Sequence, residues 1–147
     1  MANKARVLLA DSSDVALVGQ WASIMHTAQF EVVAATDTYA QMLELVSKLQ
    51  PKIIILQEQL EPELHIYQMI EELHEITSDT RIIITGLLMD GLHIRDLFHA
   101  GIDGYLYRSD SLIEALPNAL ATVMRNRKYL SPSANAEYLV AMQSPQR

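Results

Sequence analysis

Four short runs of apolar residues constrain the fold of this chain more than any other feature. They cover residues 7–10, 32–35, 53–56 and 82–84, and they are rich in β-branched side chains without alternating polar residues. Uninterrupted runs of this kind are typical of strands covered on both faces, as in a parallel sheet. A fifth run at residues 104–107 is shorter and more polar, which suits a strand at the edge of the sheet.

Segments with helical spacing separate these runs. The clearest carries an apolar stripe with steps of three and four residues, formed by Tyr39, Met42, Leu43, Val46 and Leu49. Thr38 and Gln41 give that helix a capping box at its start. A crossover helix between successive strands requires parallel neighbours and right-handed connections. We therefore expect a doubly wound α/β domain.

Composition limits the number of domains and the classes of partner. The 147 residues suit one domain at residues 1–130, and residues 131–147 are expected to form a tail or one short extra helix. A net charge of −7 opposes binding to nucleic acid, and the absence of cysteine excludes disulfides and thiolate metal sites. No apolar run approaches the roughly 20 residues that span a bilayer, so we expect a cytoplasmic protein without a membrane partner.

Polar residues follow each expected strand, at the edge where ligands gather in an open parallel sheet. The residues of interest there are Asp11, Ser12, Gln57, Glu58, Thr85, Gly86 and Arg108.

From about residue 6 to residue 132, the sequence resembles the receiver domain of bacterial two-component response regulators. The resemblance rests on the segments VLLAD (7–11), QPKIIIL (50–56), TRIIIT (80–85), AGIDGYL (100–106) and YLSP (129–132). The last two are similar to receivers that precede a LuxR/NarL-type helix-turn-helix domain. The resemblance implies a flavodoxin-like, five-stranded parallel sheet with strand order 2-1-3-4-5 and a role in two-component signal transduction.

The same resemblance implies a degenerate phosphorylation site. Such receivers carry an acidic pair, a phospho-accepting aspartate, a hydroxyl residue and a lysine after strands one, three, four and five. These positions correspond here to Asp11 with Ser12, to Gln57, to Gly86 and to Arg108. An amide cannot form an acyl phosphate, and one carboxylate is a poor magnesium site. We therefore expect no enzymatic activity, no cofactor and no bound metal.

A one-residue shift would change two of these assignments. Glu58 would become the acceptor if the third strand lay one residue later, and Thr85 would become the hydroxyl residue if the fourth strand were shifted. The uniformly apolar strands do not exclude either shift. A phosphorylatable receiver that uses Glu58 and a small-ligand sensor in the emptied acidic pocket are therefore the alternative functions.

Arg108 has two interpretations. Its guanidinium can pair with Asp11 and hydrogen-bond the Gln57 amide, holding permanently what phosphate and magnesium hold transiently in a working receiver. Alternatively, it is an exposed arginine at a strand end that contributes little to stability. The sequence favours neither.

The main expectation is a phosphorylation-independent signalling module that binds a protein partner or a second copy. Its face is built from the helix that ends at Ala100 and Gly101, the strand at 104–107 and the helix that starts near Asp110. Candidate contact residues are Leu92, Ile94, Arg95, Tyr105 and Tyr107. Tyr105 matches the family's switch aromatic, although a half-buried aromatic on an edge strand is the simpler interpretation.

Three residues in the helix before residue 100, namely His93, Asp96 and His99, have the side chains of metal ligands. Steps of three residues drift around a helix, so these side chains do not form one compact set. We expect a solvated helix face at this place.

Overall fold

The structure of the protein is a computed structural model that describes residues 3–87 and 90–143. Its strands are β1 (Ala5–Ala10), β2 (Phe30–Thr36), β3 (Ile53–Gln57), β4 (Arg81–Gly86), β5 (Gly104–Tyr107) and β6 (Tyr129–Leu130). Its helices are α1 (Asp14–Met25), α2 (Tyr39–Leu49), α3 (Ile66–Ile76), α4 (Gly91–His99), α5 (Leu112–Met124) and α6 (Pro132–Gln143). In this part of the chain, no helix is long and apolar enough to cross a membrane.

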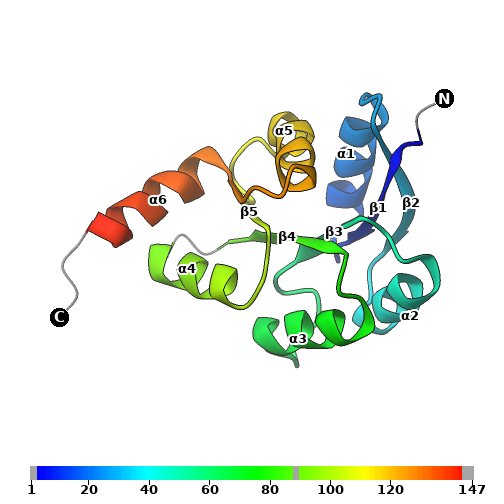
Figure 1. The fold of residues 1–147 in the computed structure, drawn as a ribbon, viewed down its shortest axis with the longest axis horizontal. Coiled ribbons are helices and arrows are strands. Elements are labelled where there is room, and N and C mark those ends of the chain that lie inside the picture. Colours follow the sequence, from blue (N-terminus) through cyan, green and yellow to red (C-terminus); the bar gives the residue numbers. More distant parts are fainter. Residues whose placement is uncertain (1–2, 88–89, 144–147) are drawn as a thin grey trace.

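The strands form one parallel sheet in the order β2-β1-β3-β4-β5-β6 (Figure 1). The predicted order 2-1-3-4-5 is confirmed, and the short strand β6 extends it by one position. Tyr129 and Leu130 pair with Gly104 and Tyr105 of β5. As a result β5, which the sequence suggested as an edge strand, lies inside the sheet.

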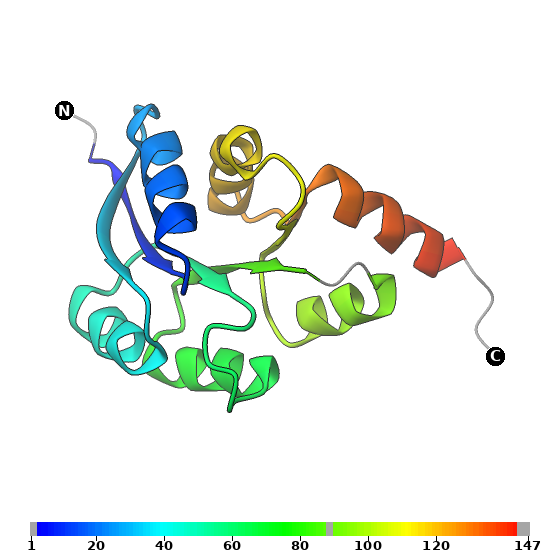
Figure 2. The same ribbon diagram turned by 180° about the vertical axis from the view of Figure 1, so that it is seen from behind.

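Helices cover both faces of the sheet. α1 and α5 lie on one side, and α2, α3 and α4 lie on the other (Figure 2). Side chains on each strand alternate between these layers, so Leu9 and Ile55 pack toward α1 and α5, while Leu8, Ile54 and Leu56 pack toward α2 and α3. Because both faces are buried, the strands have no polar alternation.

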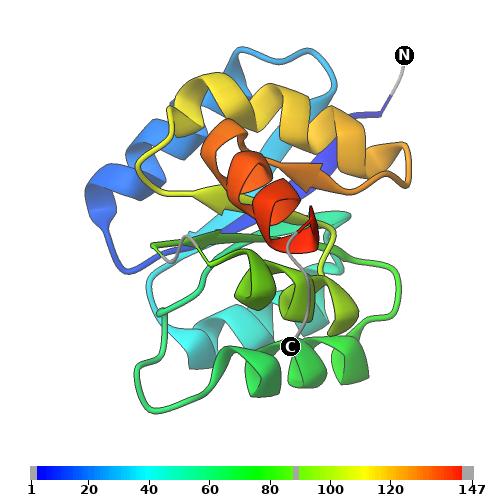
Figure 3. The same ribbon diagram turned by 90° about the vertical axis from the view of Figure 1, so that its left-hand side faces the viewer.

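The last helix, α6, lies alongside α4 (Figure 3). Gly91 permits this close approach, since a Cβ atom at Gly91 would lie only 2.5 Å from both the Cβ atom of Ala141 and the backbone oxygen of Glu137. Ala134 is fully buried, and the rings of Phe98 and Tyr138 meet edge to face at 6.4 Å between centroids. α6 is therefore packed against the domain.

Candidate functional site

An ion pair fills the centre of the site at the carboxyl ends of the strands. Nη1 of Arg108 lies 2.7 Å from Oδ2 of Asp11, and Nη2 lies 3.4 Å from Oδ1. The Asp11 side chain is 1% exposed and the Arg108 side chain 17% exposed. The backbone N–H of Ser13 donates a further hydrogen bond to Asp11 at 2.9 Å. The predicted pairing of Arg108 with Asp11 is confirmed, and the alternative of an exposed arginine is wrong.

Gln57 lies at the end of β3, beside this ion pair. Its side-chain oxygen accepts a hydrogen bond from the backbone N–H of Ser12 at 2.7 Å. The expected hydrogen bond from Arg108 to Gln57 is not formed. Nη1 of Arg108 donates instead to Oγ1 of Thr85, at 3.0 Å. The amide oxygen of Gln57 and the guanidinium of Arg108 thus each have other partners.

The hydroxyl residue of the site is Thr85, and the assignment of that position to Gly86 was wrong. Thr85 is fully buried, pairs with Gln57 across β3 and β4, and reaches Arg108. Gly86 is the next residue of the strand and therefore faces the other layer of helices. The assignment of the acceptor position to Gln57 is unchanged, because Gln57 lies beside Ser12 and Thr85 in the site.

A second polar cluster lies on that other side of the sheet. The carboxylate of Glu58 is 2.7 Å from Nε2 of His93 on α4, and the hydroxyl of Tyr105 is 3.5 Å from Glu58. Gly86 makes room for this cluster, since a Cβ atom there would lie 2.5 Å from Oε1 of Glu58 and closer still to the Tyr105 hydroxyl. No pattern in the sequence indicated this cluster, because Glu58 and His93 are far apart along the chain.

Two expectations about residues of this second cluster were therefore wrong. The His93 side chain is 17% exposed and contacts Glu58, so it does not belong to a solvated helix face. Tyr105 is fully buried, not half-buried at an edge, because β6 and α6 cover β5. Among the described residues, no three histidine, aspartate or glutamate side chains come together as metal ligands.

No protein-family model matches the sequence, but the fold is similar to those of solved structures. A two-component response regulator of the LuxR family from an Aurantimonas species aligns with a TM-score of 0.87 at 20% identity, over 97% of this chain and 100% of that one. The RcsB receiver domain from Salmonella enterica serovar Typhimurium, solved with phosphomimetic BeF3−, aligns with a TM-score of 0.83 at 18% identity, over 92% of this chain and 99% of that one. This chain has the receiver fold.

A third structure agrees with these two. The non-phosphorylated receiver domain of the stress response regulator RcsB from Escherichia coli aligns with a TM-score of 0.80 at 18% identity, over 87% of this chain and 98% of that one. In this receiver fold, the two polar clusters occupy the carboxyl ends of the strands and opposite faces of the sheet.

Fewer residues can take part in the predicted interaction face than the sequence suggested. Ile94 and Tyr105 are both fully buried, so they were wrong as contact residues. Ile94 lies on the inner side of α4, and Tyr105 packs in the same core cluster. Leu92 is 40% exposed, while Arg95 and Tyr107 are partly exposed. Of the five candidate residues, Leu92, Arg95 and Tyr107 therefore remain accessible for contact.

Asp110, in the loop before α5, holds the start of α6. Its carboxylate accepts hydrogen bonds from the backbone N–H of Ser133 at 3.0 Å and from the Ser133 hydroxyl at 2.5 Å. Burial raises the pKa of Asp110, but hydrogen bonds from Ser133 and Ser131 lower it, and the net pKa lies below the ordinary value. The carboxylate thus acts as a helix cap supplied by a distant loop.

Removal of this cap should weaken the attachment of α6. Asp110→Asn is expected to lower the free energy of unfolding by about 0.5–2 kcal/mol at pH 7. Because the folded-state pKa is depressed, the stabilisation is present above the unfolded-state pKa and is lost as the pH falls through the folded-state value. Urea unfolding at pH 7 and near pH 3 measures the difference. Asp37→Asn, which removes an exposed carboxylate, is the control; an equal effect of both variants at pH 7 would contradict the capping role.

Proposed function

We propose that this receiver-fold chain is a signalling domain that acts without phosphorylation, through contact with a protein partner. The observation that carries the proposal is the Arg108–Asp11 ion pair beside Gln57. Gln57 offers an amide where a carboxylate nucleophile is required. Asp11 is already neutralised by a guanidinium at 2.7 Å, which leaves little charge to hold magnesium.

The internal hydrogen bonds of the site also support this proposal. Gln57 binds the backbone of Ser12, and Arg108 binds both Asp11 and Thr85. Hydrogen bonds among partly buried side chains of this kind stabilise one arrangement of the site. The strand ends are thus held together by the chain's own side chains.

Use of Glu58 as the phosphate acceptor is the alternative, and the geometry weighs against it. Glu58 lies on the opposite face of the sheet from Asp11, with 8% of its surface exposed and its carboxylate bound to His93 at 2.7 Å. Phosphorylation there would break that contact, and Asp11 would not be beside the new phosphate.

The test is incubation with acetyl phosphate, or with beryllofluoride, in the presence of magnesium. We expect no added phosphate in the intact mass and no rise in melting temperature, because no ligand-stabilised folded state forms. A variant with Ser12→Asp, Gln57→Asp and Arg108→Lys, which restores the family's residues, controls for the sensitivity of the assay. A phosphate adduct on the unchanged chain that disappears in Glu58→Gln would overturn the proposal in favour of the alternative.

The partner surface that we propose runs over α4 and α6. Leu92 on α4 and Leu139 and Met142 on α6 are exposed apolar side chains of these helices. Apolar side chains in contact with water are a common feature of protein interaction sites. One solved structure of RcsB contains two dimers bound to two parallel DNAs; for the present chain we propose a protein contact.

A further inference from the structure

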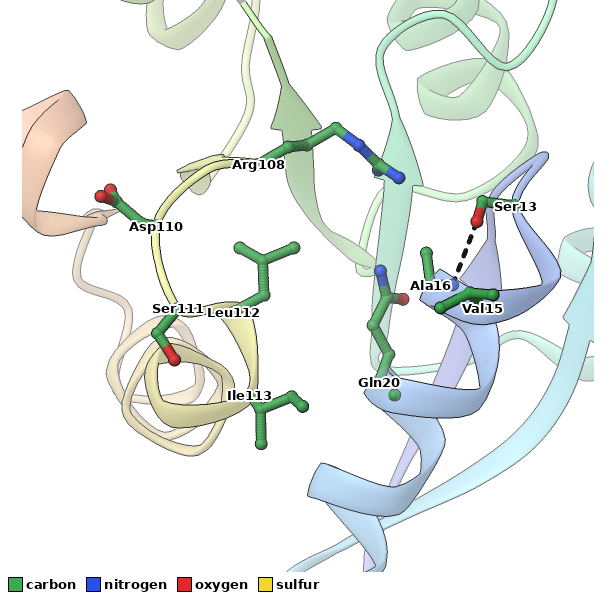
Figure 4. Close-up of a pocket in the computed structure, with 10 residues that line it drawn as sticks. Ser13, Val15, Ala16, Gln20, Arg108, Asp110, Ser111, Leu112 and Ile113 are labelled. Carbon is green, nitrogen blue, oxygen red and sulfur yellow. Dashed lines mark hydrogen bonds between the residues drawn. The ribbon is translucent and has the colours of Figure 1, made fainter.

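A pocket of about 420 Å³ lies between α1 and the segment that leads into α5 (Figure 4). Its walls are mainly apolar, with Val15 and Ala16 from α1 and Leu112 and Ile113 from α5. The carboxamide of Gln20 points from α1 into this space in Figure 4. The volume suits a small molecule, because ligand pockets commonly measure about 300–1,000 Å³.

Gln20 is the unusual residue of this pocket. It is 3% exposed, and neither its amide nitrogen nor its amide oxygen has a hydrogen-bond partner among the described residues. Buried polar side chains are nearly always hydrogen-bonded, since an unsatisfied donor or acceptor destabilises the fold. A leucine would occupy similar space without this loss. The amide is therefore explained better by a ligand than by packing.

The opposite wall of the pocket contains the start of α5. Ser111 is the N-cap residue of this helix, but its hydroxyl makes no capping hydrogen bond. Backbone N–H groups in the first turn of a helix lack partners within the helix and attract oxygen acceptors. Donors are thus available on the α5 side as well as at Gln20.

The charged groups of the pocket are already paired. Arg108 is bound to Asp11, and Asp110 is bound to Ser133. Apart from these two side chains, the lining residues are uncharged. A negatively charged ligand would consequently find no free positive charge and would be repelled by the Asp110 carboxylate, so the lining disfavours an anion.

We propose that this pocket binds a small, uncharged molecule with an apolar body and a carboxamide-like edge, in which a donor lies beside an acceptor. The Gln20 amide N–H would donate to the ligand carbonyl, and the Gln20 oxygen would accept from the ligand N–H. The apolar walls supply affinity and the amide fixes orientation. This inference goes beyond the proposed function, because it does not depend on the state of Gln57. Arg108 lines this pocket and also bonds to Asp11, so it connects the pocket with the strand ends.

Benzamide is the probe, because it combines a planar apolar ring with one carboxamide. Titration into the ¹⁵N-labelled chain should shift the Gln20 side-chain NH₂ signals saturably, together with backbone signals of α1 and of the start of α5. Toluene lacks the amide and benzoate lacks the donor and carries charge. Both should bind at least tenfold more weakly than benzamide.

Gln20→Leu provides the decisive variant, because it is expected to fold more stably than the unchanged chain. Its melting temperature should rise, while its affinity for benzamide falls at least tenfold. Gln59→Leu, at an exposed glutamine, should change neither quantity. Absence of saturable shifts with benzamide, or equal benzamide affinity in Gln20→Leu, overturns the proposal.

Discussion

Replacement of Arg108 by methionine is expected to lower the free energy of unfolding by about 3–5 kcal/mol, because it leaves a buried charge without its partner. Asp11 is 1% exposed and would keep only the backbone N–H of Ser13 as a described donor. Methionine offers no hydrogen-bond donor in place of the guanidinium. Urea unfolding at pH 7 measures the loss directly, from the midpoint and the slope of the transition.

A double variant and a control separate charge burial from lost packing. Asp11→Ala combined with Arg108→Met should be more stable than Arg108→Met alone, because no buried charge remains. Arg95→Met is the matched control: Arg95 pairs with Asp96 at 3.0 Å, but the two side chains are 34% and 48% exposed. Its expected cost is below about 1 kcal/mol. If Arg108→Met costs no more than Arg95→Met, the ion pair does not hold the site together.

Gly86→Ala is expected to displace Tyr105 from its buried position and to cost about 1–3 kcal/mol through overpacking. A Cβ atom at Gly86 would lie 2.9 Å from Cζ of Tyr105 and 2.5 Å from Oε1 of Glu58, so at least one of these side chains must move. Tyr105 is fully buried, and its movement would therefore be visible as new solvent exposure of a tyrosine. Thermal unfolding gives the cost, and NMR signals of the tyrosine ring report the displacement.

Gly104→Ala is the matched control on the neighbouring strand. A Cβ atom at Gly104 meets its nearest neighbours, Ile83 and the backbone oxygen of Tyr129, at 3.4 Å, which is ordinary contact. This variant should leave Tyr105 buried. Addition of Tyr105→Phe to Gly86→Ala should recover part of the lost stability, because the hydroxyl is the nearest atom to the new methyl group. Equal behaviour of the two alanine variants would show that Gly86 is not a point of close approach.

The sequence was sufficient to predict the sheet but not the direction of every side chain at its end. Continuous β-branched runs indicated strands buried on both faces, and the helices between them required parallel neighbours. Because every residue of these runs is apolar, the sequence did not show which side chains face which layer of helices. Thr85 and Gly86 follow residues 82–84, all isoleucine, so nothing in the pattern indicated which of the two faces Arg108.

Contacts between distant segments explain what else was missed. The strand β6 consists of Tyr129 and Leu130 alone, and its pairing with β5 depends on where the chain returns after α5. The pocket residue Gln20 resembles any polar residue of a surface helix until α5 covers it. The Arg108–Asp11 pair was one of two alternatives for Arg108, and it could be named because the family resemblance placed both residues at strand ends.

The two edges of the sheet differ in the length of backbone that they leave unpaired on their outer side. At one edge β6 offers only two residues, whereas β2 offers seven, Phe30 to Thr36. An extended segment of another molecule can form a ladder of useful length only along the longer edge. Intermolecular strand addition would therefore begin at β2, where Glu31 is exposed and is the one charged residue of the strand. A charged side chain on an edge strand opposes pairing with a strand of another molecule.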